Sequence, residues 1–134
     1  MKKMVIRNVQ VVGMHHYGRR ELDLMGTYHI ELEPQNPYDP HAVAVYDGPR
    51  KVGNLKRDNA NAIHEIVSVN MAKSKYFLRP LDFANVRNRR LGPQQSCAIT
   101  FKLEESDVDE LVAKVMKHSA TGLFVKVMDL GRKN

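Results

Sequence analysis

At residues 32–45 the chain reads Leu-Glu-Pro-Gln-Asn-Pro-Tyr-Asp-Pro-His-Ala-Val-Ala-Val, a corner with three prolines between two apolar runs. Pro37 and Pro40 fix their own φ angles and hold the residues before them in extended conformations. Tyr38 and Asp39 therefore lie between two stiffened points, where an aromatic ring and a carboxylate can meet a ligand at little ordering cost. The corner also fits a second interpretation, in which it is a rigid turn whose tyrosine covers the core.

Short strand patterns surround this corner. β-branched residues predict a first strand at residues 5–17, interrupted at Gly13, and alternating polarity predicts a second strand at residues 22–32. The turn signal Asp47-Gly48 predicts a hairpin that pairs residues 42–46 with residues 51–55. Further strands are predicted at residues 75–81, 97–103 and 123–128, whereas residues 85–95 have the composition of a loop.

Two amphipathic patterns predict helices. The first covers residues 59–71 with Asp58 as its cap. The second starts from a cap at Ser106, with Asp109 at capping-box spacing, has Lys117 and His118 in its last turn, and can end at Gly122. The predicted fold class is mainly β with two helices, in a small OB-like antiparallel barrel of about six strands. The length of 134 residues predicts a single domain over residues 1–134.

The composition limits the cellular compartments in which we expect this protein. No apolar run reaches the roughly eighteen residues that a membrane-spanning helix requires, and no signal-peptide core follows the basic N-terminus. The lone cysteine, Cys97, excludes an internal disulfide and a cysteine zinc cluster. We therefore expect a protein that has no membrane contact and is not secreted, and that is nuclear in a eukaryote or cytoplasmic in a bacterium.

The sequence contains no recognisable catalytic or metal-binding pattern. His15, His16, His29, Asp39 and His41 are near one another in sequence, but neighbouring strand residues point to opposite faces and no zinc-ligand spacing occurs. The serines lie in no nucleophile elbow, and no glycine loop could cradle a phosphate. We therefore expect no enzyme activity, no cofactor and no metal.

Positive charge is concentrated in one segment. The net charge is +6, and residues 73–90 hold most of the excess, with Asp82 opposing Lys73, Lys75, Arg79, Arg87, Arg89 and Arg90. A localised basic patch favours a polyanionic partner such as nucleic acid, although an acidic protein would fit the charge equally well. The tyrosines could supply stacking surfaces for bases, each worth about 1–3 kcal/mol.

Three segments together resemble the HIRAN domain. They are Val11-Val12-Gly13 with the basic or aromatic residues after it, Glu33-Pro34-x-Asn36-Pro37-Tyr38-Asp39-x-x-Ala42-Val43-x-Val45, and Val52-Gly53-x-Leu55-Lys56. The resemblance runs over about residues 9–71. HIRAN domains occur at the front of helicase-like transcription factor and related Swi/Snf-type DNA translocases, and also as bacterial stand-alone proteins.

The resemblance implies an OB-like barrel that binds the free 3′-hydroxyl end of single-stranded DNA. By position, Tyr38 matches the aromatic residue that stacks on the terminal base, and Asp39 matches the acceptor of the 3′-hydroxyl. A carboxylate repels a phosphate but accepts a charge-assisted hydrogen bond from a hydroxyl group. Lys56 matches a phosphate-contacting lysine, and Asn54 stands where some members carry a histidine beside the phosphates.

The chain departs from the family pattern after Gly13. His15 and His16 stand where end-binding members carry an arginine and then a tyrosine, and Tyr17 is an alternative clamp residue. A histidine ring offers less stacking area than tyrosine and is fully charged only below roughly pH 6.5. The charged residues Arg87, Arg89 and Arg90 match no family position, and their charge alone suggests a loop that follows the strand toward its end.

The resemblance predicts a targeting module for DNA repair or replication-fork processing. Such a module would bring a fused or associated helicase, translocase or nuclease to single-stranded 3′ ends. The alternative function is a protein-interaction module that keeps the barrel but has lost end recognition through the change to His15 and His16.

Overall fold

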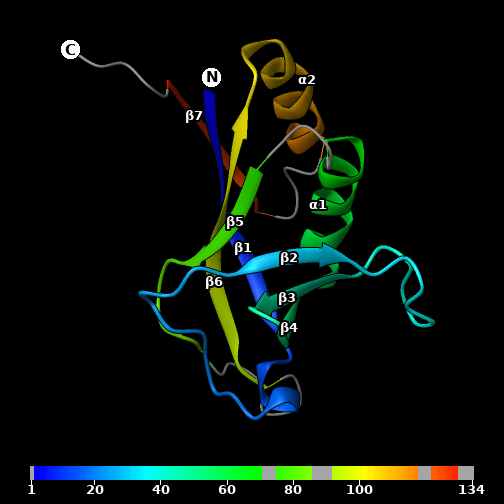
Figure 1. Ribbon diagram of the computed structural model, residues 1–134, viewed down its shortest axis with the longest axis vertical. Coiled ribbons are helices and arrows are strands. Elements are labelled where there is room, and N and C mark those ends of the chain that lie inside the picture. The colour runs from blue at the N-terminus through cyan, green and yellow to red at the C-terminus, as the bar shows by residue number, and fades with distance from the viewer. Residues whose placement is uncertain (1, 71–74, 86–91, 118–121, 130–134) are drawn as a thin grey trace.

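A computed structural model describes residues 2–70, 75–85, 92–117 and 122–129. Within these ranges the chain forms a sheet of seven antiparallel strands and two α-helices (Figure 1), which confirms the predicted fold class. The strands are β1 (Lys2–Val12), β2 (His29–Leu32), β3 (Val43–Asp47), β4 (Arg50–Leu55), β5 (Lys75–Pro80), β6 (Gln94–Leu103) and β7 (Phe124–Asp129). The helices are α1 (Arg57–Asn70) and α2 (Glu105–Met116), and a short 3-10 helix, η1 (Met14–Tyr17), follows β1.

The long strand β1 is the centre of the sheet. The strand order is β2-β3-β4-β1-β6-β5, and β7 also pairs with β1. One edge of β1 pairs with β7 near its start and with β4 at its end, while the other edge pairs with β6. A single bridge between Tyr28 and Leu78 brings the two ends of the sheet together, with backbone N···O distances of 2.9 and 2.8 Å. The sheet therefore curls into a barrel that is not fully closed.

The hydrophobic core fills this barrel and continues under the helices. Both helices present their apolar stripes to it, and Figure 1 shows α1 and α2 next to each other at one side of the sheet. The largest fully buried side chains include Phe101, Met4, Ile6, Ile63 and Leu111. Burial of apolar area at about 25 cal/mol per Å² holds the helices against the strands. No helix in the described ranges is long and apolar enough to cross a membrane.

The first two strands are shorter than predicted. β1 ends at Val12, because Gly13 adopts a left-handed conformation with φ of 75° and starts η1. The second strand begins only at His29 and not at residue 22. Leu22 lies in a loop instead, because the buried Gln95 side chain accepts a hydrogen bond from its N–H (2.7 Å) and donates one to its carbonyl oxygen (3.1 Å).

The helix caps also differ from the predictions, whereas the hairpin is confirmed. α1 begins at Arg57, so Asp58 lies in its first turn and is not its cap. α2 begins at Glu105, so the predicted cap at Ser106 is wrong, and the side chain of the actual cap residue makes no capping hydrogen bond. β3 and β4 pair around the turn at Asp47, as the sequence predicts.

Candidate functional site

The corner between β2 and β3 is held in shape by side-chain to backbone hydrogen bonds. The Oδ1 atom of Asn36 accepts hydrogen bonds from the backbone N–H groups of Tyr38 (2.9 Å) and Asp39 (3.1 Å). The Oδ1 atom of Asp39 accepts one from the N–H of His41 (2.9 Å), as expected for an aspartate that stiffens a turn. The backbone of the corner is therefore fixed before any ligand arrives.

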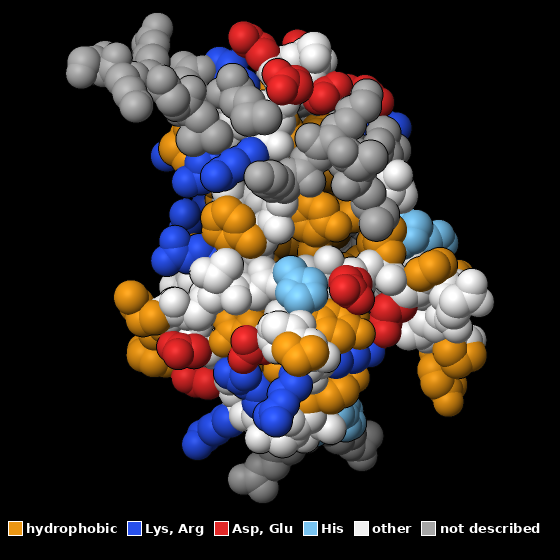
Figure 2. Space-filling view, viewed as in Figure 1, with side chains coloured by type: hydrophobic (Ala, Val, Ile, Leu, Met, Phe, Trp, Pro, Cys, Tyr) orange, Lys and Arg blue, Asp and Glu red, His pale blue; other side chains and the backbone are white. Residues whose placement is uncertain are grey.

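Tyr38 projects from this corner into solvent. Its side chain is 93% exposed, so the interpretation in which it covers the core is wrong. Figure 2 shows the corner standing out from the body of the molecule, with hydrophobic side chains at its tip. A ring that is exposed on a rigid corner can stack on a flat ligand without a rearrangement of the backbone.

The carboxylate of Asp39 lies between the side chains of Arg57 and His41. Its Oδ2 lies 3.9 Å from Nε of Arg57 and its Oδ1 lies 3.9 Å from Nδ1 of His41. These separations are longer than hydrogen bonds, so the carboxylate keeps lone pairs available for a ligand. The His41 ring also meets the edge of the His64 ring at 5.0 Å. Burial and the nearby His41 lower the pKa of His64, and the negative charge of Asp39 opposes this effect.

Glu33 connects the corner to β4 and η1. Its carboxylate accepts hydrogen bonds from Nζ of Lys51 and Nδ2 of Asn54, each at 2.8 Å. Nζ of Lys51 also lies 5.6 Å from the centre of the Tyr17 ring, a cation–π distance. Burial raises the pKa of Glu33, but the hydrogen bonds from Lys51 and Asn54 outweigh burial and hold that pKa below its usual value.

The side-chain amide of Asn54 already donates two hydrogen bonds within the protein. Besides its bond to Glu33, Nδ2 donates to the carbonyl oxygen of Val43 at 3.3 Å. Both amide hydrogens therefore have acceptors, and a phosphate contact by this donor would have to replace one of them.

η1 presents the predicted histidine pair. The rings of His15 and His16 lie 4.0 Å apart with a tilt of 38°. His15 packs against Gly92, where an added Cβ would lie 2.4 Å from the imidazole ring. At Gly53 an added Cβ would lie 3.0 Å from both Cγ1 of Val11 and the carbonyl oxygen of Val12, so the lack of a side chain there lets β4 approach β1 closely.

The structure therefore brings two pairs of the predicted site residues together. Tyr38 and Asp39 lie on the corner, and Tyr17 and Asn54 meet through Lys51 and Glu33. Lys56 is exposed at the end of β4, and its backbone N–H donates to Gln10 (2.7 Å). The predicted contacts Arg87, Arg89 and Arg90 lie outside the described residues, as does Lys73.

Sequence reasoning missed several members of this site, among them Glu33, Lys51, Arg57 and His41. Glu33 and Lys51 are 18 positions apart, and neither spacing nor residue type indicates that they form an ion pair. The hairpin register was the available signal, because it sets β4 alongside the strand that follows the corner.

Two kinds of reactive group can be checked among the described residues, a metal-binding cluster and a reactive thiol. No group of three or more His, Cys, Asp or Glu side chains among them could hold a metal ion. Burial raises the pKa of Cys97 to about 12, so its thiol stays protonated and a poor nucleophile at neutral pH.

Comparisons with known proteins agree with this fold. The chain is similar to the crystal structure of the HIRAN domain of human HLTF, with a TM-score of 0.66 and 20% identity over 87% of this chain and 92% of that one. It is also similar to an NMR structure of the HLTF HIRAN domain, with a TM-score of 0.66 and 22% identity over 90% of this chain and 89% of that one. A third similar structure is the NMR structure of the HLTF HIRAN domain in its DNA-bound conformation, with a TM-score of 0.63 and 22% identity over 86% of this chain and 88% of that one.

Two sequence comparisons test whether the chain belongs to a known family. No curated protein matched the chain. The family model of the HIRAN domain, however, matches residues 6–103, a longer stretch than residues 9–71, which carry the motifs described above. Because this match covers most of the 134 residues, the chain belongs to the HIRAN domain family.

Proposed function

We propose that this chain binds single-stranded DNA, prefers a free 3′-hydroxyl end, and performs no catalysis of its own. The proposal rests on one observation, the exposed ring of Tyr38 beside the carboxylate of Asp39 on a corner that hydrogen bonds hold fixed. The HLTF HIRAN domain, which has a similar fold, has a structure in a DNA-bound conformation, and this supports DNA as the ligand.

Each side chain of the corner has a distinct role in this proposal. Tyr38 stacks on the terminal base, and Asp39 accepts a hydrogen bond from the terminal hydroxyl. Arg57 is 79% exposed beside Asp39 and binds the phosphate that precedes the end. Lys56 binds a phosphate further along the strand, together with the basic residues Arg87, Arg89 and Arg90. His15, His16, Tyr17 and Asn54 flank the strand from η1 and β4.

The carboxylate gives the corner its preference for a hydroxyl end. A terminal phosphate would bring negative charge against Asp39, and two like charges a few ångströms apart repel each other. A terminal hydroxyl group instead donates a hydrogen bond to this carboxylate. In a larger assembly the domain would direct a helicase, translocase or nuclease to such ends during DNA repair or at a replication fork.

The test compares one labelled single strand that ends in a 3′-hydroxyl with the same strand that ends in a 3′-phosphate. Asp39→Asn removes the charge but keeps an oxygen for the N–H of His41. Asp23→Asn is the matched control, because Oδ1 of Asp23 accepts from the N–H of Met25 (3.0 Å) in the same kind of turn. We expect wild type and Asp23→Asn to prefer the hydroxyl end by about tenfold, and Asp39→Asn to lose this preference.

Two other results would contradict the proposal. Equal binding of both ends, with a strong salt dependence, would indicate a general single-strand binder without end recognition. Binding of neither strand at low salt would contradict DNA binding altogether and favour the protein-interaction module.

A further inference from the structure

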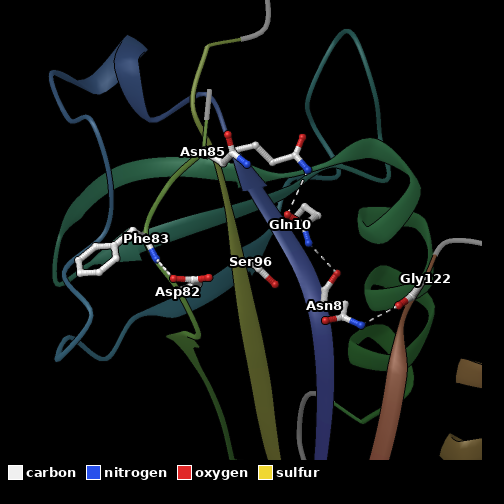
Figure 3. A pocket seen from close by; sticks show the side chains of 8 residues that line it. Asn8, Gln10, Asp82, Phe83, Asn85, Ser96 and Gly122 are labelled. Atoms are coloured by element: carbon white, nitrogen blue, oxygen red, sulfur yellow. Dashed lines mark hydrogen bonds between the residues drawn. The ribbon is translucent and has the colours of Figure 1, made fainter. Parts of the chain in front are cut away.

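A polar cavity opens where β1 and β6 run side by side. Its volume is about 390 Å³, within the range of small-ligand sites. β1, β6 and the segment after β5 each contribute side chains, which Figure 3 shows around one hollow. The lining consists of Asn8, Gln10, Asp82, Phe83, Asn85, Gln94, Ser96 and Gly122.

Hydrogen bonds hold part of this lining in place and leave part of it available. Nε2 of Gln94 donates to Oε1 of Gln10 (3.1 Å), and Nδ2 of Asn8 donates to the carbonyl oxygen of Gly122 (3.2 Å). The Asn85 amide and the Ser96 hydroxyl have no hydrogen-bond partner among the described residues. The cavity therefore combines a fixed frame with polar groups that no described residue occupies.

The charge of the lining argues against a phosphate as the ligand. Asp82 lines the cavity, and the described lining includes no lysine or arginine. One oxygen of Asp82 accepts from the N–H of Phe83 (2.8 Å), and the other can accept from a ligand. A carboxylate accepts from the amino group of cytosine, and an amide matches the donor and acceptor edge of adenine. The Phe83 ring is 63% exposed and points away from the other lining side chains in Figure 3, so it adds a stacking surface beside the hollow.

The strand register joins this cavity to the candidate DNA site. Residues directly opposite each other in antiparallel strands project from the same face of the sheet. Asn54 lies opposite Val12, Val12 lies opposite Gln94, and Gln94 lies opposite Asn85. These four residues form a row across the sheet from β4 to the cavity. The row spans three strand spacings, or roughly 14 Å. At about 3.4 Å per stacked nucleotide, a strand held near Asn54 reaches the cavity within about four nucleotides.

We propose that this cavity binds one base of the strand a few nucleotides from its 3′ end, and that Asp82 and Asn85 favour adenine or cytosine over thymine there. The proposal rests on the proposed single-strand binding. It adds a base preference at an interior position to the recognition of the end at Tyr38 and Asp39.

The test uses 3′-hydroxyl strands of thymine with one abasic, adenine or cytosine position moved stepwise from the 3′ end. We expect one interior position at which the abasic strand binds about tenfold more weakly and adenine or cytosine binds more tightly than thymine. Asn85→Ala should remove the base preference, and Phe83→Ala should reduce the abasic penalty. Phe124→Ala is the matched control, because Phe124 is similarly exposed (57%) but lies on β7 outside the lining.

The outcomes separate this proposal from the proposed function. If every interior abasic strand binds like the intact strand while the preference for a 3′-hydroxyl persists, the cavity binds no base and the end-binding function stands. A penalty that neither Asn85→Ala nor Phe83→Ala changes would place the base elsewhere and overturn the proposal. If wild type binds no strand at all, the proposed function fails and the cavity proposal fails with it.

Discussion

Tyr28 and Tyr38 are ten positions apart, yet their environments are opposite. Tyr28 is 3% exposed, and its hydroxyl accepts hydrogen bonds from the N–H of Asp23 (2.8 Å) and from Arg19 (3.3 Å). Tyr38 is 93% exposed and its ring is free for a ligand. Tyr28 falls on the apolar side of the alternation along residues 22–32, whereas Tyr38 lies between the prolines of the corner. The local sequence is therefore consistent with both environments.

The exposure of Tyr38 leads to a prediction for Tyr38→Ala. Loss of the stacking ring should weaken binding of a 3′-hydroxyl single strand by about tenfold, whereas the free energy of unfolding should stay within about 0.5 kcal/mol of wild type. Fluorescence titration and denaturant unfolding measure the two quantities. Met25→Ala, at an 84% exposed residue away from the corner, should change neither. A destabilised Tyr38→Ala protein would mean that the ring packs in solution.

At the level of elements, Gln95 attaches the loop before β2 to the start of β6. Its side chain is fully buried and bonds both backbone groups of Leu22 and also the carbonyl oxygen of Asp82 (2.9 Å). It therefore holds in place the loop at Leu22 and the turn at Asp82, which lies between the backbone hydrogen bonds that Leu81 and Asn85 make with β6. Asp82 is one of the two residues that we propose to select a base, so the same side chain supports the cavity.

Gln95→Ala should lower the free energy of unfolding by about 3 kcal/mol, because it leaves buried backbone groups of two segments without partners. Gln94→Ala is the matched control at the next position. The Gln94 side chain is half-buried and, among the described residues, bonds Gln10 alone, so its loss should cost about 1 kcal/mol or less. Denaturant unfolding curves of both variants measure the difference. Equal losses would show that the loop is held by other contacts.

At the level of the whole molecule, Glu33 makes stability depend on pH. Its pKa is lowered from 4.5 in the folded protein, so between the two values the unfolded chain binds more protons. This contribution to stability is complete above pH 4.5 and is lost as the pH falls through the folded pKa. The lowered pKa of His64 acts in the same direction, but its contribution begins to be lost as the pH falls below 6.5.

The variant Glu33→Gln separates these two contributions. We expect the free energy of unfolding of wild type to fall more steeply than that of the variant once the pH drops below 4.5. The loss that begins below pH 6.5 should be the same in both proteins, because Glu33→Gln leaves His64 and His41 in place. Unfolding curves from pH 7 to pH 3 measure both effects. Parallel curves over the whole range would contradict a lowered pKa for Glu33.

Local sequence patterns are enough to predict much of this fold. The hairpin follows from its turn residues, the two helices from their apolar stripes, and the burial of Cys97 and Ile99 from alternation along β6. The stiff corner follows from its prolines and its Asn36 and Asp39 side chains. Each of these features depends on residues a few positions apart, whose interactions are the same in any chain with that local sequence.

Contacts between segments that are far apart in the sequence account for the features that local patterns did not predict. Residues 22–28 alternate in polarity like a strand, but Gln95 from 73 positions away bonds the backbone of Leu22 and keeps it in a loop. Likewise, Glu33 meets Lys51 and Asn54 only because β4 folds back along β3. Such pairs arise when the whole sheet closes, since a buried polar group takes whichever partner the packed chain brings within reach. That partner can be predicted neither from the residue type nor from the local spacing.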